Sequence, residues 1–268
     1  MKKITANLLG PSGIIGSDNH NYGLGNQMFQ IAAALSYAAD NDFQAIFPCL
    51  RDRNHYGTYT DNILRNLVID EDMPSDSVGY SNPQPIYKPI PPSDKSIVIF
   101  DSYLQSEKYF SSNKDLIRKT FCPSDEDKEY LLKKYPNVSE SVSCHVRRGD
   151  YTQLADKYSS LTENDYYQNA IDIIGDRPMI VFSDDVNWCI ENFRVDDPQI
   201  SFSTEKDYLE IYLMSMCKDN IIANSTFSWW GAWLNGNEEK KVVAPSGWFT
   251  VEHNRKDPDL IPEDWITV

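Results

Sequence analysis

The feature that most constrains the fold is an order that recurs in the second half of the chain: short apolar segment, polar turn, helical segment. Three apolar segments, Val142–Val146, Met179–Phe182 and Asn220–Ala223, each end in a polar turn. Segments with helical spacing follow the last two turns, and another apolar segment lies at Lys241–Ala244. Such alternation is typical of a parallel α/β sheet with helices on both faces.

The first half shows the same elements less regularly. We expect strands at Ile4–Leu9, Gln44–Pro48 and Ser96–Phe100, and a helix with one apolar stripe over Gln27–Ala39. Five prolines within Pro83–Pro92 indicate an extended segment, either a linker or a loop inserted within a domain. At 268 residues the chain has room for one large domain or two small ones.

Charge excludes some classes of partner. The chain has 25 Lys and Arg against 40 Asp and Glu, a formal net charge of −15. This balance argues against a general nucleic-acid binder and against a basic membrane-binding surface, although one basic pocket is compatible with it.

The sequence shows no apolar run of the ~18 residues needed for a transmembrane segment. Five scattered cysteines without a CxxC pair predict reduced thiols and a cytoplasmic location, with peripheral contact to the inner face of the membrane left open.

Ligands of open parallel sheets bind at the carboxyl ends of the strands, so the turns after the strands are the candidate sites. Arg147 and Arg148 directly follow Val142–Val146. Two arginines at the end of a buried strand need an anion or a carboxylate beside them, and the planar guanidinium suits phosphate oxygens. Strand alternation directs the two side chains to opposite faces. The alternative is structural, with Arg148 paired to Asp150 and Arg147 at the surface.

Two further turns have polar residues suited to a ligand. Ser225 and Thr226 precede a predicted helix that ends near Gly236, where they serve either as a cap or as part of an anion site. Asp184 and Asp185 follow Met179–Phe182, and three roles are open to them: helix capping, metal binding, or acceptance of hydrogen bonds from guanine. A metal role lacks a further acidic or histidine partner nearby in the sequence.

Five segments together resemble a known family. They are Gly23–Gln30 (GLGNQMFQ), Tyr103–Phe110 (YLQSEKYF), His145–Tyr151 (HVRRGDY), Phe182–Asp185 (FSDD) and Asn224–Gly231 (NSTFSWWG). In this order they resemble the α-1,2-fucosyltransferases of glycosyltransferase family 11, and the third segment is similar to an HxRRxD block shared with α-1,6- and protein O-fucosyltransferases. The resemblance runs from about residue 21 to the C-terminus.

The resemblance implies a fold and a reaction. The fold is α/β and GT-B-like, with two Rossmann-like halves facing a cleft: an acceptor-side half at residues 1–138 and a GDP-fucose-binding half at 139–268. The reaction transfers L-fucose from GDP-β-L-fucose to the 2-hydroxyl of a terminal galactose in a glycan, with inversion. The expected substrates are this donor and a galactose-terminated acceptor, and we expect no cofactor and no metal.

The resemblance also implies roles for particular residues. Arg147 would hold the diphosphate, His145 and Asp184 would contact guanine, and Asn26 would approach fucose or phosphate. The expected donor-binding residues are Gly25, Asn26, Gln27, His145, Arg148, Asp184, Asn224, Ser225, Thr226 and Phe227, and the expected catalytic residues are Arg147 and Asp150. The general base stays open between Asp150 and two residues of the Gly10–Tyr22 loop, Asp18 and His20.

Two other functions compete with this one. A fucosyltransferase with a different linkage would share the arginine block, although the segments Gly23–Gln30 and Asn224–Gly231 argue against it. A non-catalytic sugar-binding module would explain six tryptophans and sixteen tyrosines, but not two arginines at a strand end.

Overall fold

A computed structural model gives the structure of the chain. It describes residues 1–8, 23–50, 59–69, 71–84, 86–154, 156–193, 197, 199–250 and 258–268, without the side chain of Asp150. The chain forms two compact units. Unit 1 comprises Met1–Cys122 and Asp257–Pro262, and unit 2 comprises Pro123–Lys256 and Glu263–Val268.

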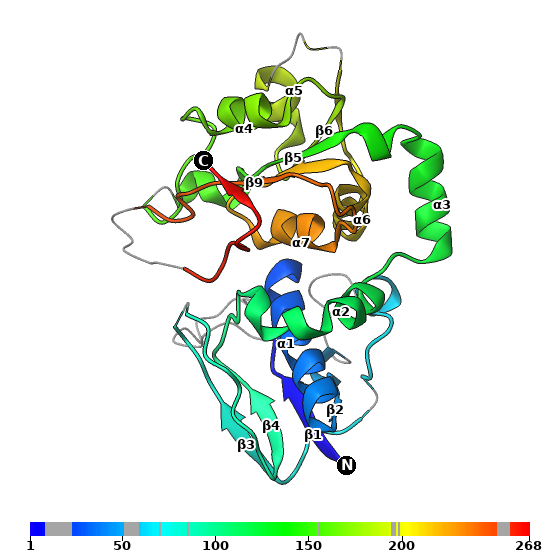
Figure 1. Cartoon of the computed structure of the whole chain (residues 1–268), viewed down its shortest axis with the longest axis vertical. Helices are drawn as coiled ribbons and strands as arrows, with labels where there is room; N and C mark the ends of the chain where they lie inside the picture. The colour runs from blue at the N-terminus through cyan, green and yellow to red at the C-terminus, as the bar shows by residue number, and fades with distance from the viewer. Residues whose placement is uncertain are drawn as a thin grey trace. The chain divides into compact units, whose positions relative to one another are not determined.

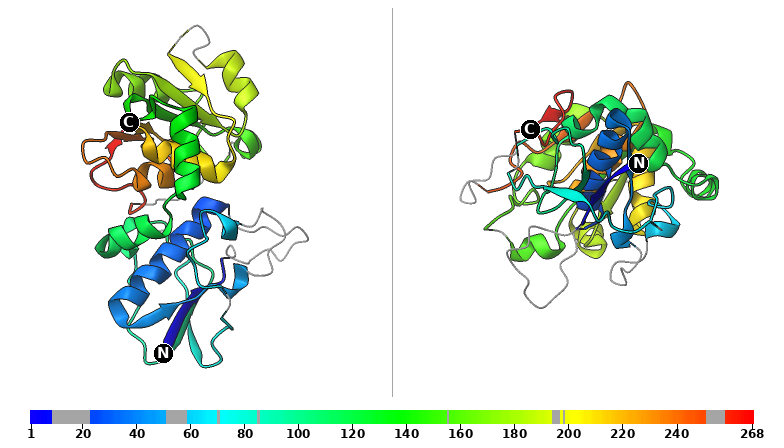
Figure 2. Two further views of the ribbon diagram at one scale, coloured as in Figure 1. Left: turned by 90° about the vertical axis from the view of Figure 1, so that its right-hand side faces the viewer. Right: turned by 90° about the horizontal axis from the view of Figure 1, so that it is seen from below.

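Unit 1 is built on a four-stranded parallel sheet (Figures 1 and 2). Its strands are β1 (Lys2–Ala6), β2 (Phe43–Ala45), β3 (Ser77–Tyr80) and β4 (Ser96–Ile99), in the order β2-β1-β4-β3. The long helix α1 (Leu24–Asn41) packs against β1 and β2, and α2 (Lys114–Thr120) contacts α1. Short 3-10 turns lie at Pro48–Leu50, Tyr59–Asp61, Glu107–Tyr109 and Ser111–Asn113.

Unit 2 contains a six-stranded parallel sheet in the order β10-β9-β8-β5-β6-β7. The strands are β5 (Val142–Val146), β6 (Met179–Ser183), β7 (Ile200–Phe202), β8 (Asp219–Ile221), β9 (Val242–Ala244) and β10 (Ile266–Thr267). The helices are α3 (Asp125–Lys134), α4 (Tyr166–Ile174), α5 (Val186–Asn192), α6 (Asp207–Met216) and α7 (Thr226–Leu234), with 3-10 turns at Val138–Glu140 and Gly149–Gln153.

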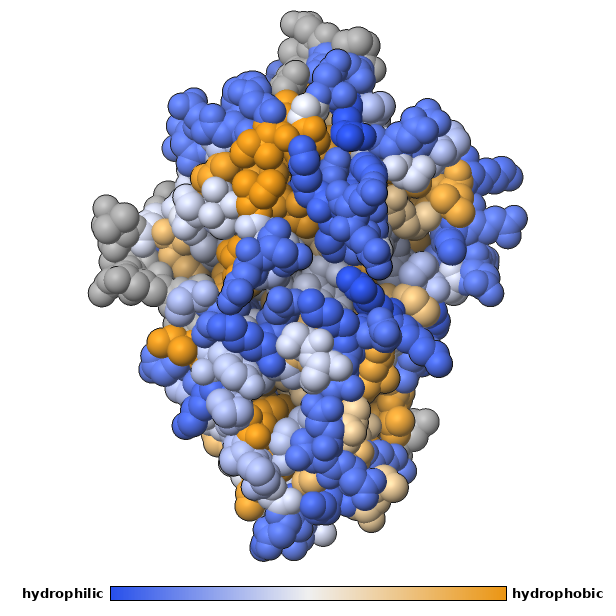
Figure 3. Space-filling view, viewed as in Figure 1, coloured by the Kyte–Doolittle hydropathy of each residue, from blue (hydrophilic) through white to orange (hydrophobic). Residues whose placement is uncertain are grey.

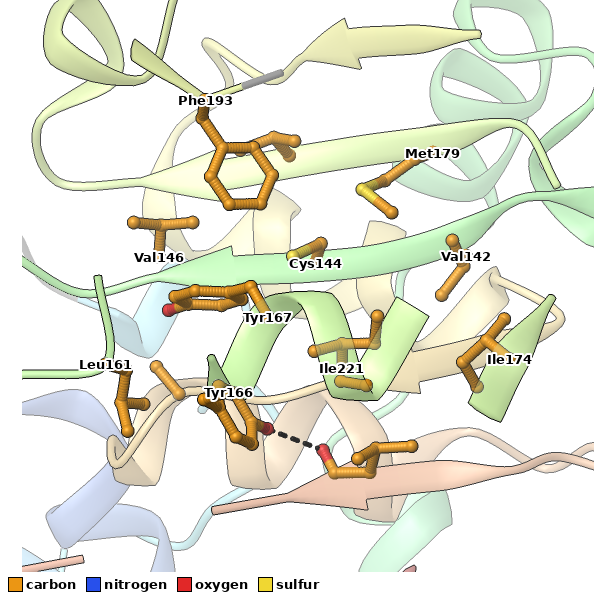
Figure 4. Packing of buried hydrophobic residues seen from close by; sticks show 14 of the residues in the cluster. Val142, Cys144, Val146, Leu161, Tyr166, Tyr167, Ile174, Met179, Phe193 and Ile221 are labelled. Carbon is orange, nitrogen blue, oxygen red and sulfur yellow. Dashed lines mark hydrogen bonds between the residues drawn. The ribbon is translucent and has the colours of Figure 1, made fainter. Parts of the chain in front are cut away.

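Helices cover both faces of this sheet, as the sequence predicted (Figure 1). Alternate residues of β5 point to opposite sides. One set packs with α4 and α5 in a buried cluster that includes Val142, Cys144, Val146, Tyr166, Tyr167, Met179, Phe193 and Ile221 (Figure 4). The Tyr166 hydroxyl donates to the Val243 carbonyl at 3.0 Å in this cluster. On the other side His145 meets Ser228 of α7. Core packing therefore fixes which residues reach each face.

The expected boundary and the observed units differ. Sequence analysis divides the chain between residues 138 and 139, whereas the units divide between Cys122 and Pro123. Helix α3 packs against α6 and therefore belongs to unit 2. The proline-rich segment 83–92 connects β3 and β4 within unit 1, so it is an inserted loop and not a linker between units.

The surface is mostly hydrophilic on the face that Figure 3 shows. On the face shown in Figure 3, hydrophilic side chains cover most of the molecule, and apolar side chains form separate patches. In the part of the chain that the structure describes, no helix is long and apolar enough to cross a membrane.

Candidate functional site

The candidate site lies at the carboxyl ends of three neighbouring strands of unit 2. Strand β5 pairs in parallel with β8 on one side and with β6 on the other. The turns after these strands therefore share one edge of the sheet, where ligands of such sheets bind. In the β5–β6 register Val146 lies opposite Ser183, so the residues that follow, Arg147 and Asp184, emerge side by side.

Arg147 and Asp184 form an ion pair. The Nη1 atom of Arg147 lies 2.7 Å from Oδ2 of Asp184, and the Arg148 backbone N–H donates to Oδ1 at 2.9 Å. Both carboxylate oxygens are thus engaged by the turn after β5. A Cβ atom on Gly149 would lie 2.2 Å from Oδ2 of Asp184, so only glycine permits this close approach. The contacts that the structure describes for Asp184 orient Arg147, and its contact with guanine stays a prediction.

Arg148 points to a different aspartate from the one considered in the sequence. Its Nε lies 3.3 Å from Oδ2 of Asp185, and its guanidinium carbon lies 3.6 Å from the centroid of the Trp188 ring. Asp185 also caps α5, because its Oδ1 accepts a hydrogen bond from the Trp188 N–H at 3.3 Å. The side chain of Asp150, the partner considered from the sequence and one of the three candidate bases, lies outside the described residues.

A pocket of about 270 Å³ opens beside the two arginines. Its lining combines guanidinium, aromatic and hydroxyl groups with one carboxylate, and comprises Arg147, Arg148, Tyr151, Thr152, Tyr158, Ser159, Ser160, Thr162 and Glu163. The rings of Tyr151 and Tyr158 stack at 3.9 Å, and the Arg147 guanidinium carbon lies 5.1 Å from the Tyr151 centroid. Sequence reasoning selected the arginines but missed the segment from Tyr158 to Glu163, because no motif identifies it.

His145 is buried below this edge of the sheet. Its side chain is 3% exposed, and its Nδ1 lies 2.9 Å from the Ser228 hydroxyl. Burial, and then the nearby Arg147 charge, lower the pKa of His145 to about 3, so the ring is neutral at physiological pH. The Ser228 hydroxyl also accepts from the Ala223 N–H at 3.2 Å. His145 and Ser228 therefore tie β5 to the turn between β8 and α7.

The start of α7 has the predicted cap. Ser225 is the N-cap residue, and its hydroxyl accepts from the Phe227 N–H at 3.4 Å. Asn224 is buried, and its amide donates to the carbonyls of Ser159 and Trp248, at 3.0 Å in each case. Asn224 thus holds the pocket segment in place. The helix ends at Leu234 with Asn235 as its C-cap, not Gly236 as predicted, because the Asn235 amide bonds to the Cys217 carbonyl at 2.8 Å.

The Gly23–Gln30 segment forms the first turns of α1 in unit 1. Gly25 and Gln27 are buried, and Asn26 is half-buried. The Asn26 Oδ1 accepts a hydrogen bond from Gln105 Nε2 at 2.8 Å. This bond joins two of the sequence segments, and sequence analysis did not anticipate it. Asp18 and His20, the alternative bases, and the rest of the Gly10–Tyr22 loop lie outside the described residues.

One further titratable group near the site was missed. Glu210 of α6 is 9% exposed. Burial raises its pKa to about 7, while a hydrogen bond with Ser203 opposes that shift. A single glutamate within a helical pattern gives no sequence signal of such burial.

Across the described part of the chain, no three His, Cys, Asp or Glu side chains are grouped so as to hold a metal ion.

Comparisons with known proteins identify the family. Residues 90–268 match the family described as "Glycosyl transferase family 11". The chain is 38% identical to the O-antigen biosynthesis glycosyltransferase WbnK of Escherichia coli, in a match that covers 62% of this chain and 59% of WbnK. It is 32% identical to an alpha-1,2-colitosyltransferase of Escherichia coli, over 92% of this chain and 96% of that protein. A galactoside 2-alpha-L-fucosyltransferase of Caenorhabditis elegans is 28% identical, in a match that covers 82% of this chain and 68% of that protein.

The fold is also that of a solved protein. The structure resembles the fucosyltransferase NodZ from Bradyrhizobium with a TM-score of 0.54 and 13% identity, over 86% of this chain and 91% of NodZ. This similarity confirms the expected GT-B-like architecture of two Rossmann-like α/β units. The sequence matches confirm the expected family: this chain belongs to glycosyltransferase family 11.

Proposed function

We propose that the chain is an inverting α-1,2-fucosyltransferase, which transfers L-fucose from GDP-β-L-fucose to the 2-hydroxyl of a terminal galactose. The observation that carries the proposal is the pocket lined by Arg147 and Arg148 at the carboxyl ends of the strands, in a member of family 11. Two guanidinium groups beside one pocket suit a diphosphate, because each offers a planar pair of donors to phosphate oxygens.

The chemistry proposed for this pocket is a single displacement. The galactose 2-oxygen forms a bond to fucose C1 while the bond from C1 to the β-phosphate oxygen breaks, and GDP leaves with the electron pair. Negative charge then grows on the β-phosphate, so Arg147 interacts more strongly with the transition state than with the bound donor. The Thr226 N–H and the Ser225 hydroxyl at the start of α7 are proposed to donate hydrogen bonds to the phosphates, because the Ser225 N–H already donates to the Ala223 carbonyl at 2.7 Å.

The remaining roles in the proposal are orientation and proton removal. Asp184 keeps Arg147 in place through the ion pair at 2.7 Å, which supports a positioning role for this carboxylate. A base must take the proton from the galactose hydroxyl as the new bond forms. Asp150 lies two residues after Arg148 in the sequence and is the proposed base.

A second donor has specific support. The relative that matches 92% of this chain is an alpha-1,2-colitosyltransferase. Colitose is L-fucose without its 3-hydroxyl. One site can therefore bind both sugars unless a polar group of the protein forms a hydrogen bond with that hydroxyl. A site that hydrogen-bonds a hydroxyl discriminates strongly against a sugar that lacks it. The activated 3-deoxy sugar is therefore the alternative donor.

The test uses the full chain and the two GDP-sugars, each with lactose, N-acetyllactosamine and galactosyl-β-1,3-N-acetylhexosamines as acceptors. We expect transfer from GDP-fucose, and an α link to galactose O2 in the product by NMR. Transfer from GDP-colitose alone would replace the donor in the proposal. A product linked at another hydroxyl would indicate a transferase of different linkage. No transfer, and no rise in melting temperature with GDP, would favour a sugar-binding module.

A further inference from the structure

Asn26 has a fixed amide orientation in unit 1. Its Oδ1 accepts the hydrogen bond from Gln105 Nε2 at 2.8 Å, across 79 residues of sequence. A side-chain amide has one acceptor end and one donor end. With the acceptor end occupied by Gln105, the two N–H donors point to the other side. Among the described residues, no group accepts a hydrogen bond from these donors.

The loop that presents Gln105 is strained and firmly held. After β4, Asp101 and Leu104 adopt left-handed backbone angles, with φ of 48° and 53°. For residues other than glycine each such angle costs on the order of 1–3 kcal/mol, and such residues gather at functional sites. Gln30 of α1 donates to the Ser102 carbonyl at 2.6 Å, and the Ser102 hydroxyl accepts from the Asn82 N–H at 2.7 Å. The loop therefore keeps one conformation despite its strain.

We propose that Gln105 is a positioning residue for the transfer reaction: it turns the Asn26 amide so that its N–H groups, and not its oxygen, meet the substrate. The inference rests on the proposed function and on the substrate-binding role that the family resemblance implies for Asn26. The group that Asn26 contacts is then a hydrogen-bond acceptor, either a phosphate oxygen or a sugar oxygen. Without Gln105 the amide has two orientations, and only one of them is productive.

Substitution of Gln105 by glutamate separates this role from packing. Glutamate has nearly the same shape, but its carboxylate can only accept hydrogen bonds. In Gln105→Glu the Asn26 amide must therefore turn over, donate to the carboxylate and present its oxygen to the substrate. Gln105→Ala leaves the amide able to turn either way. We expect Gln105→Glu to lose about tenfold or more in kcat, equivalent to about 1.4 kcal/mol, and Gln105→Ala to lose less.

Two controls make the outcome decisive. Gln84 is exposed and lines the same shallow depression as Gln105, so Gln84→Glu introduces the same charge nearby and should keep wild-type kcat. In an Asn26→Ala background, both substitutions of Gln105 should change kcat less than about twofold, because coupled residues are not additive. If Gln105→Glu is as active as Gln105→Ala or more so, Gln105 acts through packing and the proposal is wrong.

The orientation can also be measured without substrate. In the wild-type protein the Asn26 side-chain N–H groups should exchange rapidly with water, whereas in Gln105→Glu one of them should be protected and shifted downfield in an NMR spectrum. Identical spectra would overturn the inference. An inactive wild-type chain would instead refute the proposed function, and the NMR result would still decide the orientation.

Discussion

The two units present different polar groups at the carboxyl ends of their strands. In unit 2 the described contacts there include two ion pairs, Arg147 with Asp184 and Arg148 with Asp185. In unit 1 they include hydrogen bonds between neutral groups: Gln30 accepts from the Leu8 N–H at 3.1 Å and donates to Ser102, and Gln105 donates to Asn26. Guanidinium groups suit a phosphate, whereas amides suit a neutral ligand rich in hydroxyl groups. The two units, each built on a parallel sheet, thus differ in the polar groups that they present at this edge.

The largest expected effect comes from removal of the positive charge in unit 2. Arg147→Ala should lower kcat by roughly 10²–10³-fold, the usual result of removing one preorganised donor. Arg147→Lys should also be impaired, because lysine lacks the planar pair of donors. The melting temperature without GDP should change little, since the ion pair with Asp184 is partly exposed.

Arg177 provides the matched control for this comparison. It pairs with Asp219 at 3.4 Å and precedes β6, at the opposite end of the sheet. Arg177→Ala should keep wild-type kcat in the folded protein. If Arg147→Ala has near-wild-type kcat when it is measured beside this control, the positive charge of Arg147 serves the structure of unit 2 and not the transfer reaction.

The next prediction tests whether the orientation of the Arg147 guanidinium, and not only its positive charge, contributes to kcat. Gly149→Ala places a methyl group where Asp184 Oδ2 now lies, so the carboxylate must move away from Arg147. We expect a loss of about 10–10²-fold in kcat, because small displacements of reacting groups are costly. Gly236→Ala is the control, since a Cβ there meets nothing within 4 Å. Full activity of Gly149→Ala would mean that the ion pair does not position Arg147.

A smaller effect concerns the buried acid of unit 2. Burial raises the pKa of Glu210 from 4.5 to about 7. The unfolded chain loses this proton first, so Glu210 destabilises the fold increasingly as pH rises from about 4.5 to 7. Glu210→Gln should remove this loss, so the free energy of unfolding of the variant minus that of the wild type should increase by roughly 1–3 kcal/mol between pH 4 and pH 8. Denaturant titrations across this range measure it.

The control for Glu210 is an exposed acid. The Glu239 side chain is 83% exposed, so Glu239→Gln should leave the pH dependence of unfolding as in the wild type. An identical slope in the Glu210→Gln and wild-type proteins would show that Glu210 ionises normally in the folded state.

The smallest expected effect is that of metal removal. If the arginines and the start of α7 supply the positive charge in unit 2, transfer should continue at the full rate in excess EDTA. A large loss that Mg²⁺ or Mn²⁺ restores would contradict this prediction. Asp184 and Asp185 would then become candidate metal ligands.

Local sequence signals predicted the central strands of unit 2 well. The bounds of β5 agree with the prediction, and those of β6 and β9 agree within one residue at each end. Strands β3, β7 and β10 and helices α2, α3 and α4 were not expected. The three strands lie at sheet edges, and β3 is mostly exposed, so they lack the apolar pattern of a central strand.

The candidate site was predicted by residue type but not by partner. Arg147, Arg148 and Asp184 do meet at one edge of the sheet. The described partner of Arg148 is Asp185, which lies 37 residues away and was not considered as its partner from the sequence. Gln105 lies in the family segment Tyr103–Phe110, but its hydrogen bond with Asn26 had no local signal, and neither had the burial of Glu210, because both arise only in the folded chain.

The sequence by itself determined the order of the central strands of unit 2, the turns that follow them and the helices after those turns, because apolar spacing and capping residues act within a few positions of each other. It also determined that two arginines follow a buried strand. The tertiary structure alone decided what these residues contact. The register of β5 against β6 sets Val146 opposite Ser183, so that Arg147 meets Asp184. The strained loop after β4 likewise brings Gln105 to Asn26. Such pairings depend on how distant strands align, which no short segment of the chain encodes.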